Sequence, residues 1–68
     1  MITAKHIREI WESDPKNVAR HFTAILKDFG YSVTPDYAED EIRRLYAGGS
    51  PKGGPSMFID RWLKDGIA

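Results

Sequence analysis

Two histidines, His6 and His21, are the only side chains of this 68-residue chain that titrate near neutral pH without a perturbed environment. Glu9 follows His6 by three residues, which places both side chains on one face of a helix and could supply two metal ligands. His21 could add a third ligand if its helix packs beside that of His6. No His-x-x-x-His pair or other ligand pattern accompanies them, and cysteine is absent. We therefore expect no metal site and no cofactor.

A cluster of carboxylates is the second candidate for chemistry, and it comprises Asp36, Glu39, Asp40 and Glu41. Paired acids can perform acid–base catalysis or bind a cation. A calcium loop, however, needs oxygen ligands at alternate positions around a glycine turn, and that pattern is missing. Negative charge is favourable at a helix start, where unpaired amides carry partial positive charge. We interpret the cluster as the acidic beginning of a helix.

Nucleophilic and phosphate-binding motifs are also incomplete. No serine stands in a Gly-x-Ser-x-Gly context, and there is no cysteine nucleophile. The segment 48–55 holds four glycines and two prolines around Lys52, so its amides could cradle a phosphate. Glycine rather than serine or threonine follows this lysine, and no strand precedes it, which favours a flexible hinge. A short helical chain also has little room for a substrate pocket, and we expect no enzymatic activity.

The elements that must position these residues are helices with clear start and stop signals. Thr3, Asp14-Pro15 and Thr34-Pro35 are typical N-caps, the latter two with proline at the first helical position. Gly30 and Gly48 fit the left-handed position that ends a helix. Between these signals, apolar residues recur at helical spacing, most regularly from Val18 to Phe29.

A fourth, shorter helix is predicted over about residues 56–64, after the glycine- and proline-rich loop, with Gly66 as its C-cap. The sequence therefore predicts an all-α fold, a small bundle of three to four short helices forming a single helical domain over residues 1–68. Its expected core comprises Ile7, Ile10, Trp11, Val18, Phe22, Ile25, Leu26, Phe29, Tyr31, Ile42, Leu45, Ile59, Trp62 and Leu63.

The balance of charge bears on the class of partner. Ten basic side chains face ten acidic ones, so the chain lacks the basic excess of a general nucleic-acid binder. A helix–turn–helix adaptor remains the alternative function, with Lys16, Arg20, Lys27 and Arg43 as its phosphate contacts. Residues 31–47, which would hold the reading helix, carry four acidic side chains against two basic ones. Nucleic acid is therefore an unlikely partner.

Hydropathy indicates a cytoplasmic protein without membrane contact. No more than three apolar residues occur in succession, so we expect neither a membrane span nor a secretory signal. The absence of cysteine fits a reducing compartment.

Protein recognition is the function that these exclusions leave. The last predicted helix carries Met57, Phe58, Ile59, Trp62 and Leu63, which is apolar on more than one side. If Ile59 and Leu63 dock on the bundle, Met57, Phe58 or Trp62 stays exposed, with Tyr46 at the rim; alternatively, the small core encloses them all. We expect a small non-enzymatic interaction module that binds a protein partner, or itself as a homo-oligomer, through an apolar patch including this helix.

Overall fold

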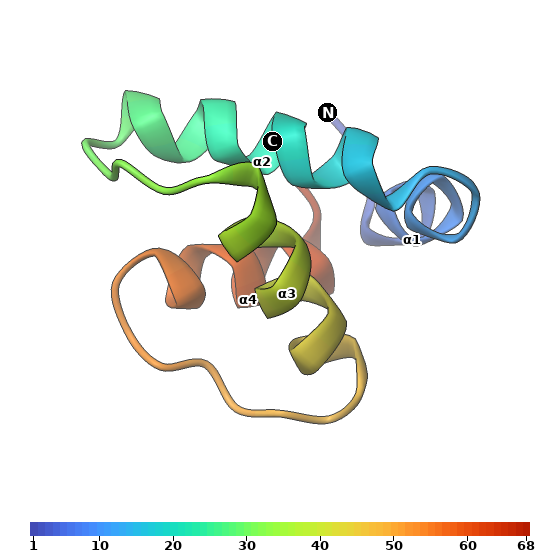
Figure 1. Ribbon diagram of the computed structural model, residues 1–68. Helices are drawn as coiled ribbons and strands as arrows, with labels where there is room; N and C mark the ends of the chain where they lie inside the picture. The colour runs from blue at the N-terminus through green and yellow to red at the C-terminus, as the bar shows by residue number, and fades with distance from the viewer.

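Figure 1 shows the computed structural model of the protein, which describes residues 1–68. Four helices follow one another along the chain: α1 (Ala4–Ser13), α2 (Pro15–Asp28), α3 (Pro35–Tyr46) and α4 (Pro55–Asp65). This confirms the predicted all-α bundle and the glycine- and proline-rich loop before its last helix. None of the four combines the length and the apolar character that crossing a membrane requires.

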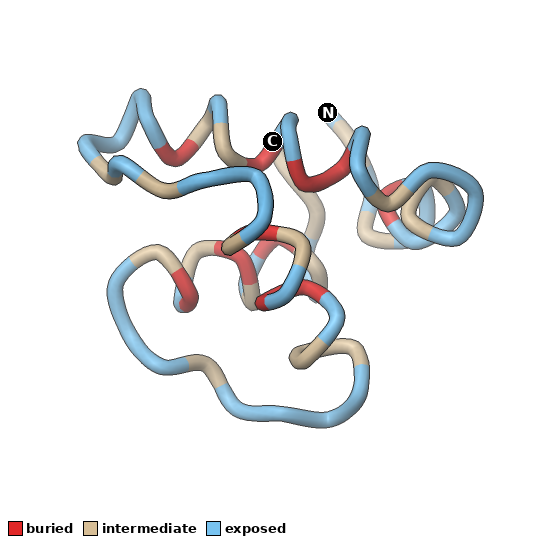
Figure 2. The backbone as a smooth tube through the Cα atoms, viewed as in Figure 1, coloured by how far each residue is buried: buried red, intermediate tan, exposed pale blue.

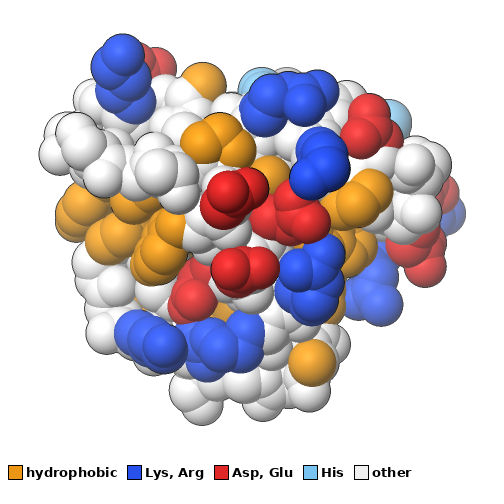
Figure 3. Space-filling view, in the orientation of Figure 1, with side chains coloured by type: hydrophobic (Ala, Val, Ile, Leu, Met, Phe, Trp, Pro, Cys, Tyr) orange, Lys and Arg blue, Asp and Glu red, His pale blue; other side chains and the backbone are white.

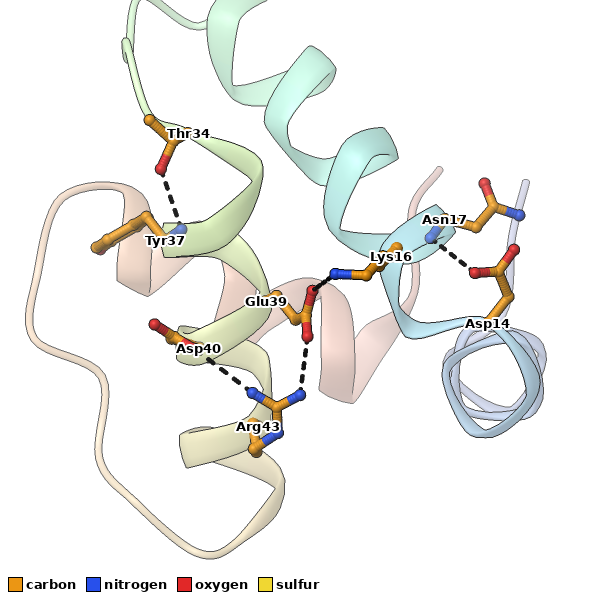
Figure 4. Close-up of polar contacts among 8 residues, drawn as sticks. All are labelled: Asp14, Lys16, Asn17, Thr34, Tyr37, Glu39, Asp40 and Arg43. Atoms are coloured by element: carbon orange, nitrogen blue, oxygen red, sulfur yellow. Dashed lines mark hydrogen bonds and ion pairs between the residues drawn. The ribbon is translucent and has the colours of Figure 1, made fainter.

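The first three helices begin where their capping residues predicted. In each case the cap side chain accepts a hydrogen bond from a backbone amide of the first turn and so satisfies a donor that has no partner within the helix. These bonds run from the amides of His6, Asn17 and Tyr37 to the side chains of Thr3, Asp14 and Thr34, at 3.1, 3.4 and 3.1 Å. Figure 4 shows the second and third of them.

Helix α2 ends as predicted, in a turn that needs glycine. Gly30 adopts a φ of +91°, and its amide donates to the carbonyl of Lys27 at 3.0 Å, while the amide of Tyr31 donates to that of Leu26 at 2.9 Å. These two bonds define a Schellman motif. The same arrangement recurs at Gly48, where α3 ends.

Helices α2 and α4 each contact all three other helices, and the most extensive contact is that between α2 and α3. In Figure 1 α2 lies along one side of the molecule, with α3 and α4 packed below it and α1 beyond its first turn. Helices α1 and α3 meet only through side chains. The two ends of the chain pair with each other, because Ile2 and Ile67 exchange two backbone hydrogen bonds of 2.7 Å.

The core lies where the four helices face one another, as the buried segments in Figure 2 show. Seven predicted core residues form one buried cluster: Ile7, Val18, Phe22, Leu26, Ile42, Ile59 and Trp62. Six others are half-buried against it: Ile10, Trp11, Ile25, Tyr31, Leu45 and Leu63. The prediction for Phe29 is wrong, because its side chain is 58% exposed. Phe29 is the C-cap residue of α2. It stands at the end of the apolar stripe of this helix, and its ring is not covered there.

The loop between α3 and α4 is held at both ends. The amide of Gly49 donates to the carbonyl of Arg44 at 3.0 Å, which continues the turn that ends α3. Near the other end, the amide of Lys52 donates to the hydroxyl of Ser56, also at 3.0 Å. The loop therefore delivers α4 to a defined place against α3.

Candidate functional site

Five aromatic rings from α2, the α2–α3 connection and α4 form a continuous cluster. Two of them, Phe22 and Trp62, meet edge to face with their ring centres 5.2 Å apart. Phe58 lies 5.9 Å from Trp62 and 5.8 Å from Tyr31, and Phe29 stacks on Phe58 at 5.1 Å. The cluster thus extends from the core to the surface.

Its inner and outer members differ in exposure. Phe22 and Trp62 are 1% and 7% exposed, so Trp62 belongs to the core and is not part of an exposed patch. Phe29 is 58% exposed, Phe58 is half-buried, and Met57 beside it is 52% exposed. We call Phe29, Met57 and Phe58 the outer aromatic face. Apart from Met1, its two exposed members are the only exposed large apolar residues of the chain.

Helical spacing explains why α4 divides its apolar residues between two sides. Ile59 and Trp62, three residues apart, are buried, and Leu63 is half-buried beside them. Phe58 precedes Trp62 by four residues, so it lies at the edge of this stripe, whereas Met57 lies on the opposite side of the helix from Ile59. Of the three residues that the sequence offered as an exposed patch, Met57 is exposed, Phe58 is half-buried and Trp62 is buried, as its place in the expected core also predicted.

A shallow groove of about 320 Å³ continues from the outer aromatic face along α4. Its four charged residues are two acids and two bases: Asp60, Arg61, Lys64 and Asp65. Lys64 pairs with Asp60 at 3.1 Å, one helical turn away, whereas Arg61 and Asp65 take part in no ion pair. The groove therefore offers one free cation and one free anion beside an apolar surface.

Tyr46, the fourth predicted site residue, belongs to a different cluster. Its ring lies 5.9 Å from that of Trp11, and the guanidinium of Arg8 sits 4.2 Å from its centre. Burial raises the pKa of its phenol, and the nearby charge of Arg8 opposes that rise. Its hydroxyl is buried without a hydrogen-bond partner. Tyr46 fills the space between α1 and α3.

The predicted phosphate contacts are partly neutralised by carboxylates. Lys16 and Arg43 both pair with Glu39, at 3.5 and 2.9 Å, and Arg43 also reaches Asp40 at 3.4 Å, as Figure 4 shows. Arg20 and Lys27 are exposed and in no ion pair. In Figure 3 basic and acidic side chains alternate over this face, with hydrophobic side chains gathered beside the α2–α3 connection.

The connection itself also departs from a helix–turn–helix. Six residues, 29–34, separate α2 from α3, whereas the DNA-binding motif uses a turn of about three or four. Asp36, in the first turn of α3, places a negative charge where a reading helix would approach the bases.

One polar network was not foreseen from the sequence. Glu41 is 5% exposed and accepts hydrogen bonds from the guanidinium of Arg44 and, at 2.6 Å, from the hydroxyl of Ser56. The bond from Arg44, reinforced by Ser56 and opposed by burial, holds the pKa of the Glu41 carboxyl below its ordinary value. Ser56 itself is fully buried and accepts from the amide of Lys52. The network joins α3, the loop and α4.

Sequence offered a partial signal for this network. Glu41 lies three residues after the buried Ala38 and beside the buried Ile42, so it falls on the inner side of α3 rather than at its acidic beginning. The interpretation of Glu41 as helix-start charge is therefore wrong. The contact with Ser56, fifteen residues away, depends on tertiary packing and has no local signature.

The histidines remain at the surface. His6 lies 3.8 Å from Glu9 with both side chains 59% exposed, and His21 is exposed on α2. No group of three or more histidine, cysteine, aspartate or glutamate side chains is close enough to hold a metal ion. His21 and Asn17 border a second depression, of about 190 Å³, whose other lining residues are Ile2, Ile7, Ile10, Val18 and Phe22.

The outer aromatic face is thus the surface feature least explained by the stability of the monomer, because large apolar side chains exposed together usually mark an interface. Comparison with known proteins finds no matching family model, no matching curated protein and no matching solved structure.

Proposed function

We propose that this protein is a small, non-enzymatic interaction module of the cytoplasm that binds a partner protein, or another copy of itself, through the outer aromatic face. The observation that carries the proposal is the stack of Phe29 on Phe58, whose ring centres are 5.1 Å apart although Phe29 is 58% exposed. An exposed stack leaves apolar area in water that a partner can cover.

The support beneath this stack favours binding over accidental exposure. Phe58 rests on Trp62, which in turn contacts Phe22 in the core. A side chain held by a packed neighbour loses little conformational freedom when a partner covers it, which lowers the entropic cost of association. Rigid aromatic anchors with a polar rim are the usual composition of energetically important interface positions. The charged groove along α4 provides such a rim.

The proposal is tested with a pair of double variants that leave the net charge unchanged. Phe29→Ser with Met57→Ser removes the two most exposed apolar side chains of the face. Lys5→Ser with Glu12→Ser is the matched control, since both residues are exposed on α1 and in no ion pair. Each protein is examined by sedimentation for self-association, and by titration against purified proteins that copurify with the wild type.

We expect the control variant to associate as the wild type does. The outer-face variant should lose these associations. Far-ultraviolet circular dichroism establishes that both variants are folded. If an association survives both outer-face substitutions unchanged, the face is not the binding surface. Titration of duplex DNA at low salt covers the alternative adaptor function, and binding that depends on Lys16 and Arg43 would favour it over our proposal.

A further inference from the structure

We infer that the occupant of the outer aromatic face is a second copy of this chain, docked about a two-fold axis so that Arg61 of each copy meets Asp65 of the other. This inference rests on the proposed function, which it deepens by naming the partner. It starts from the charges that flank the face. Arg61 and Asp65 both line the groove that begins at Met57 and Phe58.

These two residues are four apart on α4 and form no ion pair with each other. The base precedes the acid, which is the less favourable order for pairing within one helix. Asp60 and Lys64 on the same helix do pair, at 3.1 Å. Arg61 and Asp65 therefore keep one positive and one negative charge available at the surface.

A free cation and a free anion on one helix face suit a two-fold partner in particular. In a two-fold dimer the same patch contacts itself, so a contact from one residue to another is made twice. If Arg61 approaches Asp65 of the partner, symmetry brings the other Asp65 to the other Arg61. A partner whose rim carried a single sign of charge would match one of these residues and repel the other.

The charge of the whole chain removes the usual obstacle to self-association. Ten basic and ten acidic side chains cancel, so two copies do not repel each other at long range. Burial of the two outer faces against each other would also cover Phe29 and Met57, the exposed apolar residues that a monomer leaves in water.

The area of the outer aromatic face and its groove limits the affinity expected of the dimer. A standard interface buries about 800 Å² on each partner, which would be nearly a fifth of the 4368 Å² that this chain exposes. Three apolar residues and one side of an 11-residue helix provide less than that. We therefore expect a weak dimer whose population rises between micromolar and millimolar protein concentration.

Charge reversal at the two positions tests the pairing. In Arg61→Asp, aspartates of the two copies would face each other, and in Asp65→Arg, arginines would do so. Each single variant should bind itself at least about tenfold more weakly than the wild type. The double variant, with both reversals, restores opposite charges across the axis and should regain wild-type association. An equimolar mixture of the two single variants should form a mixed dimer for the same reason.

Sedimentation velocity over a concentration series gives the readout, and Arg20→Asp is the matched control, since Arg20 is exposed on α2 and in no ion pair. Recovery in the double variant and in the mixture separates loss of pairing from loss of folding, because an unfolded variant cannot recover. The inference is overturned if the wild type stays monomeric at millimolar concentration, or if neither the double variant nor the mixture recovers.

Failure of this inference can be told apart from failure of the proposed function. Suppose that the wild type is monomeric but binds another protein, and that the Phe29→Ser, Met57→Ser variant does not bind that protein. The second copy is then not the occupant, but the outer aromatic face is still the binding surface. If the wild type self-associates and the outer-face variant does so equally, both are overturned.

Discussion

Glu41 shows how much a single side chain can hold together in a small bundle. A buried carboxylate is expensive unless its oxygens are paired, since an ion loses its hydration when it leaves water. Here Arg44 supplies a countercharge from the next turn of α3, and Ser56 supplies a hydrogen bond of 2.6 Å from α4. Glu41 and Ser56 are the only buried polar residues of the chain, and they bond to each other across the α3–α4 contact.

Replacement of Glu41 by glutamine should destabilise the fold and flatten its acid response. Glutamine keeps an acceptor for Ser56 but removes the charge that Arg44 pairs with, at a cost of about 1–3 kcal/mol. The pKa of Glu41 is lowered in the native state, so its contribution is present above the unfolded pKa and is lost as the pH falls through the native one. Urea unfolding should give the wild type a larger free energy of unfolding than Glu41→Gln at neutral pH, and the difference should shrink as the pH falls below the ordinary pKa range of a glutamate carboxyl.

A control variant separates the loss of the Glu41 charge from the general effect of acid on the protein. The pKa of Glu39 is also lowered, chiefly by Arg43, and this carboxylate adds to the acid sensitivity of both proteins equally. Glu12→Gln is the control, because Glu12 is exposed and in no ion pair, and it should follow the wild type at every pH. A gap between wild type and Glu41→Gln that persists in acid would mean that lost packing, rather than lost charge, causes the destabilisation.

At the scale of the elements, sequence reasoning succeeds where the determinants are local. Caps act within one turn, so Thr3, Asp14 and Thr34 could be assigned from their neighbours, and Gly30 likewise marks a turn that few other residues adopt. The last helix, expected over about 56–64, runs over Pro55–Asp65. Beyond α4, the backbone of Ile67 pairs with that of Ile2, a contact between opposite ends of the chain that no local pattern predicts.

Two glycines with positive φ should respond differently to replacement by alanine. Gly30 has a φ of +91° and open space where a side chain would go, so Gly30→Ala costs only the left-handed strain, about 1–2 kcal/mol. Gly66 has a φ of +84°, but a Cβ there would lie 2.4 Å from the carbonyl oxygen of Ile2. Gly66→Ala should therefore also break the pairing of Ile2 with Ile67 and lose at least about 1 kcal/mol more. Urea unfolding followed by circular dichroism gives both values, and equal losses would show that the terminal pairing contributes nothing.

At the scale of the whole molecule, periodicity predicts which side of a helix is apolar. It does not predict how much of that side the other helices cover. Phe22 and Phe29 stand on the same stripe of α2, seven residues apart, and the sequence assigns both to the core. The structure buries the first against Trp62 and leaves the second at the surface. Where a stripe stops being covered depends on the lengths and crossing of the other helices, which single-sequence patterns do not contain. The sequence therefore offered the α4 part of the outer aromatic face as one of two alternatives, and it assigned Phe29 to the core.

This pair of phenylalanines separates stability from association. Phe22→Ala removes a ring that is 1% exposed and should cost about 3–5 kcal/mol. The free energy of unfolding of a domain of this length is only about 3–10 kcal/mol, so a large fraction of the Phe22→Ala molecules should unfold. Phe29→Ala removes a ring that is 58% exposed and gives up little beyond its stack on Phe58, about 1 kcal/mol. Thermal unfolding by circular dichroism measures the first effect and sedimentation the second. We expect Phe29→Ala to stay folded while its association weakens; a variant that unfolds like Phe22→Ala would mean that Phe29 serves the core and that the outer aromatic face is not available for binding.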